Sequence, residues 1–462
     1  MRNATGGMAM VATLLVASGC SMLRATIGAY ETGPDGIARP QQQLREALVR
    51  ADFVAALGWP EDDALLRALG TGASSYYAAQ YARSVSVLDS AALIADDRIT
   101  NSVSGNVIAL VTNDMARPYQ ARRTERLFIP YYAMLAYVRL EQWEDAAVEA
   151  RRLSGLLAQY AGDRNDSERA THATLHYLTG VVFERAGEKG DAQVAYRLAR
   201  ALLPDQVDSA RSRVGKGDGE ILVVLERGFV AHRATETISV FLGESDRDAL
   251  EHGEGDDSAG LVRRIADRLS QTNNAERAPV VADRSGAPRR ERERHDDDGY
   301  WLHVSFPSLR RAPRFTGEPT MMIDGERKLA TRVGTVVDDA ASADEGRERV
   351  ALLARAVARA GAKYAVTKAV KDSKGEVAGT IANLGTAVMD RADIRSWHVL
   401  PQTLTLLRVR VPAGQRAVHV NVDDGMEGLD LGDVLVRPGQ LTIVSARVWR
   451  ETARAHQLAA TR

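Results

Sequence analysis

Cysteine is almost absent from this chain, which has one, Cys20, among 462 residues. A single cysteine excludes an internal disulfide, so the folded part must be stabilised by an ordinary core. Aromatic residues make up only 5% of the chain, whereas hydrophobic residues make up 45%, which predicts a core of aliphatic side chains and alanine. The formal net charge of −1 provides no basic excess, and we therefore expect no nucleic-acid partner.

Long apolar runs are lacking as well. The run from Met8 to Ala17 is far shorter than the ~20 residues of a membrane-spanning helix, and a signal peptide explains it better. The residues Ala17-Ser18-Gly19-Cys20 resemble a bacterial lipobox, where the signal peptide is removed and the cysteine is acylated. An ordinary signal peptide or a buried cysteine are the alternatives. We predict that residues 1–19 are a lipoprotein signal peptide and that Cys20 is the lipidation site.

The residues after Cys20 indicate where the protein is held. Ser21, in place of aspartate, resembles the Gram-negative lipoproteins that travel to the outer membrane. Each buried methylene of an acyl chain contributes ~0.8 kcal/mol, so a triacylated cysteine is a permanent anchor. Scattered glycine and proline in residues 20–40 predict a flexible tether. We therefore predict a lipid-anchored protein on the periplasmic face of the outer membrane.

Residues 41–210 follow a helical period and contain three degenerate copies of a helix–turn–helix pattern. Two weaker copies, around Gly72 and Trp143, precede a clearer one. The clearest copy has the spacing of the 34-residue tetratricopeptide repeat at Gly180, Phe183, Ala192, Tyr196, Ala199 and Pro204. About three such hairpins are needed to bury a continuous core by stacking. The pattern predicts an all-α domain of tetratricopeptide-like hairpins.

The first helix of each hairpin in such an array ordinarily lines a concave groove. Two arrangements are open here: the groove is presented to a protein partner, or the same face packs on the downstream domain. If the groove is open, Tyr131→Ala should lose a partner and keep its fold. The residues expected to line it are Phe128, Tyr131, Leu135, Arg139, Tyr177 and Val181.

Residues 211–450 change to strand-like patterns. The continuous apolar run at 220–225 predicts a buried central strand, and the alternation at 418–422 predicts a strand with one wet face. Two alanine-rich helices are expected at 349–371 and 377–393, and a disordered polar insertion at 244–298. We expect the strands on both sides of the insertion to form one sheet. The predicted fold class is α+β, with a β-rich, sandwich-like second domain and a C-terminal tail at 451–462.

Patterns that would carry chemistry are weak. His172 and His176 have metal-ligand spacing, but no glutamate between them matches the zinc-protease pattern, so they indicate a helix face. The glycine-rich residues 215–219 precede a strand, whereas a phosphate-binding loop opens a helix. The acidic residues 423–427 lack the alternating ligands of a calcium loop. We predict no catalytic residue, no cofactor and no metal.

One segment is more specific. Residues 392–401, Ala-Asp-Ile-Arg-Ser-Trp-His-Val-Leu-Pro, together with residues 132–137 and 358–364, resemble a family of uncharacterised tetratricopeptide-repeat-containing lipoproteins of Gram-negative bacteria. The resemblance covers about residues 60–425. It implies a cell-envelope protein and attaches no activity, although some members look as though they accompany lipoproteins that activate peptidoglycan synthases. This chain departs from the family in its long polar insertion.

The motif in this segment has two interpretations. It is either a structural lock that fixes the second alanine-rich helix on the sheet, or a binding surface. If it is a lock, Arg395→Ala should lower thermal stability. The motif residues are Asp393, Arg395, Trp397 and Pro401.

The functional prediction follows from the anchor and the repeats. We predict a protein-interaction scaffold without enzymatic activity, whose partners are cell-envelope proteins and which contacts the membrane through lipidated Cys20. The alternatives are a regulator or accessory factor of peptidoglycan synthesis, and a ligand-binding or enzymatic module without a recognisable site.

Overall fold

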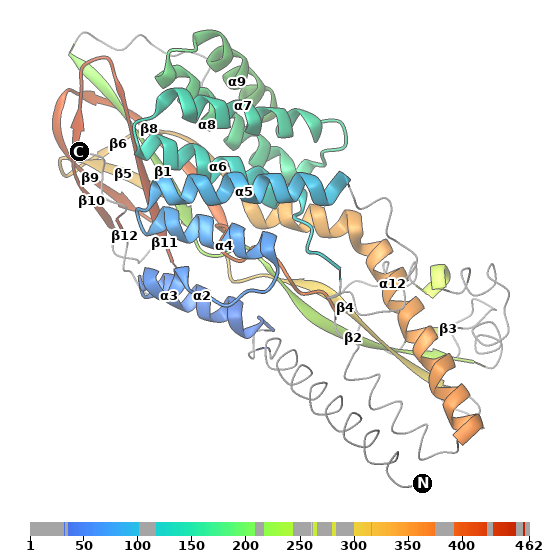
Figure 1. Ribbon diagram of the computed structural model, residues 1–462. Coiled ribbons are helices and arrows are strands. Elements are labelled where there is room, and N and C mark those ends of the chain that lie inside the picture. The colour runs from blue at the N-terminus through green and yellow to red at the C-terminus, as the bar shows by residue number, and fades with distance from the viewer. Residues whose placement is uncertain are drawn as a thin grey trace, which may run out of the picture.

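The computed structural model describes residues 36–100, 117–207, 217–243, 262–265, 280–282, 300–315, 317–374, 392–422, 428–449 and 456–457, with two single residues, 32 and 260. Within these residues the chain is mixed α+β, with helices first and β-sheets after them, as predicted (Figure 1). The predicted signal peptide, Cys20, most of the polar insertion and residues 377–391 of the predicted second alanine-rich helix lie outside the described residues.

Three helical hairpins form most of the N-terminal half. They are α4 (Ala64–Tyr77) with α5 (Tyr81–Thr100), α6 (Arg123–Arg139) with α7 (Trp143–Gln159), and α8 (Arg169–Ala186) with α9 (Lys189–Leu202). Two helices, α2 (Arg39–Val49) and α3 (Phe53–Leu57), precede them, and a short 3₁₀ turn, η4 (Asp166–Glu168), leads into α8. Helices therefore lie where the helical period predicts them.

The same turn joins the two helices of each hairpin. Ala79, Glu141 and Gly187 occupy equivalent places, with φ angles of 57°, 58° and 84°. A left-handed residue of this kind ends a helix by letting the chain fold back on its last carbonyls. The amide after each one donates to a carbonyl five residues earlier: Gln80 to Ser75 at 2.8 Å, Gln142 to Tyr137 at 3.0 Å and Glu188 to Phe183 at 2.8 Å. The same turn, at Ala51, also joins α2 to α3, where the Asp52 amide donates to the Ala47 carbonyl at 2.9 Å.

Glycine allows close contact between the paired helices. A Cβ atom added at Gly72 in α4 would lie 2.6 Å from Cδ2 of Leu88 in α5, and one at Gly180 would lie 2.9 Å from the Tyr196 ring. The Ser84 hydroxyl donates to the Gly72 carbonyl at 2.8 Å across the same contact. The small residues of the repeat pattern thus lie where two helices touch.

We expect Gly72→Ala to lower the free energy of unfolding by ~1–3 kcal/mol, because the added methyl overpacks a tight contact. Gly155 in α7 provides a control of opposite sign, since a Cβ there meets nothing within 4 Å. Gly155→Ala should raise the free energy of unfolding by ~0.5–1 kcal/mol through helix propensity. Urea denaturation measures both changes. A Gly72→Ala protein as stable as the wild type would contradict the contact.

A five-stranded sheet lies under the hairpins, with strand order β12-β11-β1-β8-β7. Its central strand β1 (Asp218–Arg227) pairs in parallel with β11 (Leu441–Val448) and antiparallel with β8 (Thr403–Pro412). The outer strands are β7 (Thr331–Val336) and β12 (His456–Gln457), so the expected C-terminal tail contains a short strand. The predicted buried central strand is confirmed, because residues 221–225 are all 0% exposed.

A second sheet packs against the other face of the first. Its order is β10-β9-β5-β6, with β5 (Thr320–Ile323), β6 (Glu326–Lys328), β9 (Gly414–Asn421) and β10 (Leu429–Val436). Alternate residues of β1 separate the two interfaces: Ile221 and Val223 contact the second sheet, whereas Leu222 and Val224 share a core with the helices. The predicted alternation is confirmed over residues 418–421 of β9, where Val418 and Val420 are buried and Asn421 is exposed. The body therefore has three layers.

A third sheet, β3-β2-β4, extends away from the hairpins beside α12 (Figure 1). Its strands are β2 (His232–Leu242), β3 (Val280–Ala282) and β4 (Tyr300–Arg310), and α12 spans Val337–Lys374. Valine and phenylalanine of β4 pack on leucine and alanine of α12 in a small separate core. No helix in the described part of the chain is both long enough and apolar enough to cross a membrane.

Two predictions about this region are corrected, one about strand pairing and one about helix bounds. The strands on both sides of the insertion, β2 and β4, do not join the β1 sheet but pair with each other along their length. The chain leaves β1 at Gly228, whose φ of 66° turns it away from that sheet. Within the insertion, Val280–Ala282 form the short strand β3, which pairs with β2. The first alanine-rich helix begins at Val337, before the predicted start, and Ala392 and Asp393 are not helical.

Candidate functional site

The helix face predicted to line a partner groove lies inside the protein. Tyr131 is 0% exposed, and even Arg139 is only 9% exposed, with its Nε donating to the Tyr81 hydroxyl at 3.1 Å. Helices α6 and α8 share one core with the five-stranded sheet, so the alternative of packing on the downstream domain is what the structure has. The open groove is wrong for all six residues, namely Phe128, Tyr131, Leu135, Arg139, Tyr177 and Val181.

A charged group lies at the centre of this helix–sheet interface. The alternation of β1 brings Glu226 to the same face as Leu222 and Val224, where it is 2% exposed. A buried carboxylate is unfavourable unless its oxygens accept hydrogen bonds. Three tyrosine hydroxyls donate to it: Tyr77 at 3.0 Å, Tyr132 at 3.1 Å and Tyr131 at 3.2 Å. These donors connect β1 with α4 and α6.

Arg447 completes the buried charge pair. It is the register partner of Glu226 on the parallel strand β11, and its Nη1 lies 3.7 Å from Glu226 Oε1. Its Nη2 donates to the carbonyl of Gly228 at 2.6 Å and to that of Val399 at 3.1 Å, and its guanidinium stacks 4.2 Å from the centre of the Trp449 ring. Burial raises the pKa of Glu226, whereas Arg447 and the tyrosine hydroxyls act to lower it.

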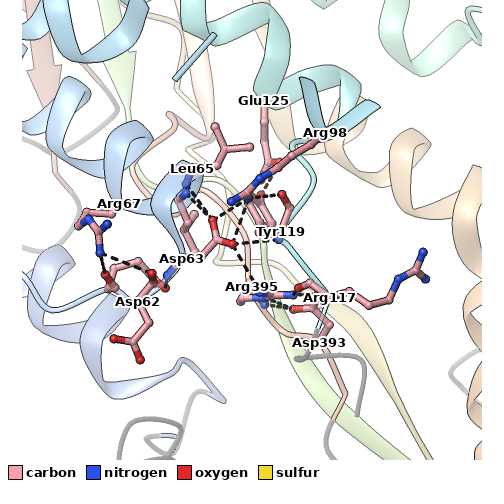
Figure 2. A network of polar contacts seen from close by, with 12 residues as sticks. Asp62, Asp63, Leu65, Arg67, Arg98, Arg117, Tyr119, Glu125, Asp393 and Arg395 are labelled. Carbon is pink, nitrogen blue, oxygen red and sulfur yellow. Dashed lines mark hydrogen bonds and ion pairs between the residues drawn. The ribbon is translucent and has the colours of Figure 1, made fainter. Parts of the chain in front are cut away.

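A second polar network holds the motif of residues 392–401 against the helices (Figure 2). Arg395 binds Asp393 in a fork, with Nε to Oδ1 and Nη2 to Oδ2 both at 2.8 Å. Its Nη2 also donates to the Arg117 carbonyl at 2.8 Å, and its Nη1 lies 3.8 Å from Asp63 Oδ2. Planar two-point pairing of this kind fixes orientation as well as charge.

Asp63 connects this network to the first hairpin. It caps α4 by accepting from the Leu65 and Leu66 amides, and it accepts from Arg98 Nη1 at 2.8 Å and the Tyr119 amide at 3.0 Å (Figure 2). Burial acts to raise the pKa of Asp63, but the hydrogen bonds from Arg98 and the backbone amides outweigh it and hold the pKa below its usual value. Asp63 therefore carries a negative charge between two arginines.

Trp397 is fixed by a carboxylate from the second hairpin. Its amide donates to Glu125 Oε1 at 2.8 Å, while Glu125 Oε2 accepts from the Tyr119 hydroxyl at 2.5 Å and the Arg122 amide at 2.8 Å. The Trp397 side chain is buried beside Tyr132, and Pro401 is buried before β8 begins. These contacts favour the structural lock for Asp393, Arg395, Trp397 and Pro401. These contacts fasten residues 392–401 to α4 and α6, whereas the second alanine-rich helix of the predicted lock lies outside the described residues.

Sequence reasoning missed the two charged residues at the centre of the interface. Glu226 follows an apolar run in β1, and Arg447 occupies a position where the alternation of β11 calls for an apolar residue. A charge at an inward strand position is costly unless it is paired, so this mismatch was the available signal. Because both groups are buried, this network holds the layers together and does not meet a solute.

The weak chemical patterns have different outcomes. His172 and His176 are both buried on α8. Among the described residues, no three His, Cys, Asp or Glu side chains are placed to share a metal ion. The acidic residues 423–427 lie outside the described part of the chain, and so do residues 215 and 216 of the glycine-rich loop.

Comparison with known proteins gives no family and no function for this chain. Protein-family models, curated proteins and solved structures were all searched, and none matches this chain.

Proposed function

We propose that this protein is a lipoprotein of the outer membrane, facing the periplasm, that acts as a protein-interaction scaffold. In this proposal its hairpins are tetratricopeptide-like and its two stacked sheets form a sandwich. The recurrent left-handed turn and the glycine contacts of the hairpins support the first part, and the core shared by the two sheets supports the second. The lipobox-like sequence at Cys20 supports the anchor.

The observation that carries the scaffold proposal is a groove on the outer side of the hairpins. Because α6 and α8 are buried on the sheet, the second helices α5 and α7 form the outer surface. The groove between them has a volume of about 270 Å³ and is lined by Ile129 and Pro130 of α6. Asp96 pairs with Arg126 at 2.6 Å and with Arg152 at 3.6 Å within it, so the groove offers charged as well as apolar contacts.

Two large apolar residues flank this groove. Leu93 is 71% exposed and lies three residues before Asp96, while Val148 is 53% exposed and lies one helical turn before Arg152, a groove residue. Residues at these spacings share a helix face. Covering apolar side chains of this size contributes ~1.5–3 kcal/mol each, enough to anchor a protein partner at this groove.

Cross-linking mass spectrometry in native membranes tests the proposal. The double variant Leu93→Asp/Val148→Asp should lower the yield of a defined cross-linked partner by about tenfold or more, because 1.4 kcal/mol corresponds to tenfold in affinity. Val54→Asp is the matched control, since Val54 is equally apolar and 85% exposed but lies on α3. Cys20→Ala should also lose the partner by losing the anchor.

Two outcomes would overturn the scaffold. In the first, no protein is cross-linked to the wild type. In the second, the double variant gives the same yield of the cross-linked partner as the wild type and as the Val54→Asp control.

A further inference from the structure

The edge of the five-stranded sheet at β11 is only partly covered by another strand. β11 pairs with β1 along its whole length, but β12 pairs with it only at Ala446 and Arg447. Among the described residues, no other strand is hydrogen-bonded to this edge. A strand edge presents a row of backbone amides and carbonyls that another extended segment can bind. Residues 441–445 of β11 therefore form a possible site for a further strand.

The hydrogen bonds to β1 define which backbone groups of β11 point to this edge. The carbonyls of Gln440 and Val448 accept from amides near the two ends of β1, at 2.9 Å and 2.8 Å. The amide and carbonyl of one strand residue point to the same side, and the side alternates from residue to residue. The even-numbered residues of β11 therefore bond to β1. The amides and carbonyls of Leu441, Ile443 and Ser445 point away from β1, to the edge.

These outward groups lie in buried surroundings. Leu441, Ile443 and Ser445 are 7%, 4% and 3% exposed. In the described part of the chain, no residue bonds their outward amides or carbonyls. Backbone groups with so little access to water are costly when they are unpaired, and in native proteins nearly all of them are paired. The edge therefore requires a partner strand.

The register of β12 places the next residues of the chain on this edge. Residues 458–462 follow β12 and lie outside the described residues. β12 runs antiparallel to β11, with His456 opposite Arg447. In an antiparallel pair, each step forward along one strand is a step back along the other. The same register, continued, sets residues 458–462 opposite residues 445–441 in that order.

The polarity of residues 458–462 fits this register. Residues 458–460, Leu-Ala-Ala, fall opposite residues 445–443, which are at most 4% exposed. Thr461 falls opposite Thr442, which is half-buried, and facing threonines stabilise a strand pair. A slip of one residue would turn every side chain to the other face, so the match supports one register.

We propose that residues 441–445 of β11 bind residues 458–462 of the same chain as an edge strand. In this pairing Leu458 and Ala460 exchange backbone hydrogen bonds with the outward groups of β11, while the amide of Ala459 points to solvent. The bound segment closes the sheet edge and withholds it from the strands of other chains, including a second copy of this one. This site is separate from the α5–α7 groove, and its occupant does not depend on the scaffold proposal.

Two introduced cysteines test the pairing and its register. The full chain with Cys20→Ala has no other thiol. In that background, Thr442→Cys with Thr461→Cys should form an intramolecular disulfide in most molecules on mild oxidation, because opposite residues lie about 4.5–5.5 Å apart at Cα. Thr442→Cys with Ala460→Cys is the matched control, whose second thiol is on the other face, and its disulfide yield should be at least tenfold lower. Mass spectrometry of non-reduced peptides measures both yields.

Proline substitutions give a second measurement without new thiols. Ala460→Pro removes an amide that donates to β11, whereas Ala459→Pro removes an amide that faces solvent, where an edge strand tolerates proline. Ala460→Pro should therefore speed hydrogen exchange at the Ile443 and Ser445 amides by about tenfold or more. Ala459→Pro should change this exchange much less. Hydrogen exchange followed by mass spectrometry compares both variants with the wild type.

Three results would overturn the proposal. The first is a disulfide-linked dimer in place of the intramolecular bond, since the edge would then hold a strand of a second copy. The second is an equal disulfide yield, or no disulfide, in the two cysteine pairs. The third is exchange at Ile443 and Ser445 that is the same in the wild type and in both proline variants.

Discussion

Arg447→Met should lower the free energy of unfolding by ~3–5 kcal/mol, the largest effect that we expect of any single substitution in this protein. Methionine fills much of the space of the arginine but leaves the Glu226 carboxylate buried beside no cation. It also removes the donor to the carbonyls of Gly228 and Val399. Denaturant unfolding followed by tryptophan fluorescence measures the change, since Trp449 lies against the arginine.

A double-mutant cycle separates the charge pair from the other contacts of Arg447. In the Arg447→Met background, Glu226→Gln should cost less than it does in the wild type, and the difference is the coupling energy. Arg416→Met is the matched control, because Arg416 also lies on a strand and pairs with an aspartate, Asp324, at a half-exposed site. It should cost ~1 kcal/mol or less. Equal costs for Arg447→Met and Arg416→Met would contradict the central role of the buried pair.

Arg395→Ala should lower the free energy of unfolding by about 3 kcal/mol, at the lower end for a broken buried pair because Asp393 keeps some contact with water. The substitution removes the fork to Asp393, the hydrogen bond to the Arg117 carbonyl and the ion pair with Asp63 at the start of α4. Of their described attachments to the helices, residues 392–401 then keep only the one to α6 through Trp397. Thermal unfolding followed by circular dichroism measures the loss.

Arg67→Ala controls for removing an arginine close to the same network (Figure 2). Arg67 is exposed and donates to the Glu61 carbonyl at 2.7 Å, and its loss should cost ~0.5 kcal/mol or less. Arg395→Lys keeps the charge without the planar fork and should fall between the two. If Arg395→Ala is as stable as Arg67→Ala, the motif is not a structural lock.

Patterns within short stretches of sequence predicted the helices and strands that form through contacts between residues close in the chain. The continuous apolar run of β1 predicted a central strand, and this strand is buried on both faces. Gly72 and Gly180 lie at helix contacts because the hairpin geometry is set within a few dozen residues. Sequence reasoning is reliable where the cause and the consequence are close in the chain.

Long-range pairing was not predictable in the same way. Nothing within β2 distinguishes β1 from β4 as its neighbour, and the choice depends on a residue outside the strand, the left-handed Gly228. The partner of Glu226 lies more than 200 residues away at Arg447. The burial of the inner face of α6 likewise depends on a sheet whose strands lie much further along the chain. These features are properties of the assembled fold.

The attachment of Trp397 to Glu125 spans 272 residues of sequence, and it has a consequence for the order of folding. Helices α4, α6 and α8 complete their core only when β8 and β11, close to the C-terminus, are in place. Until then an emerging chain exposes the apolar face of three hairpins. Contacts this far apart slow folding and leave intermediates prone to aggregation. We therefore expect the hairpins α4–α9 and the five-stranded sheet to fold together, because a chain that stops before β8 leaves its helices without the sheet that covers them.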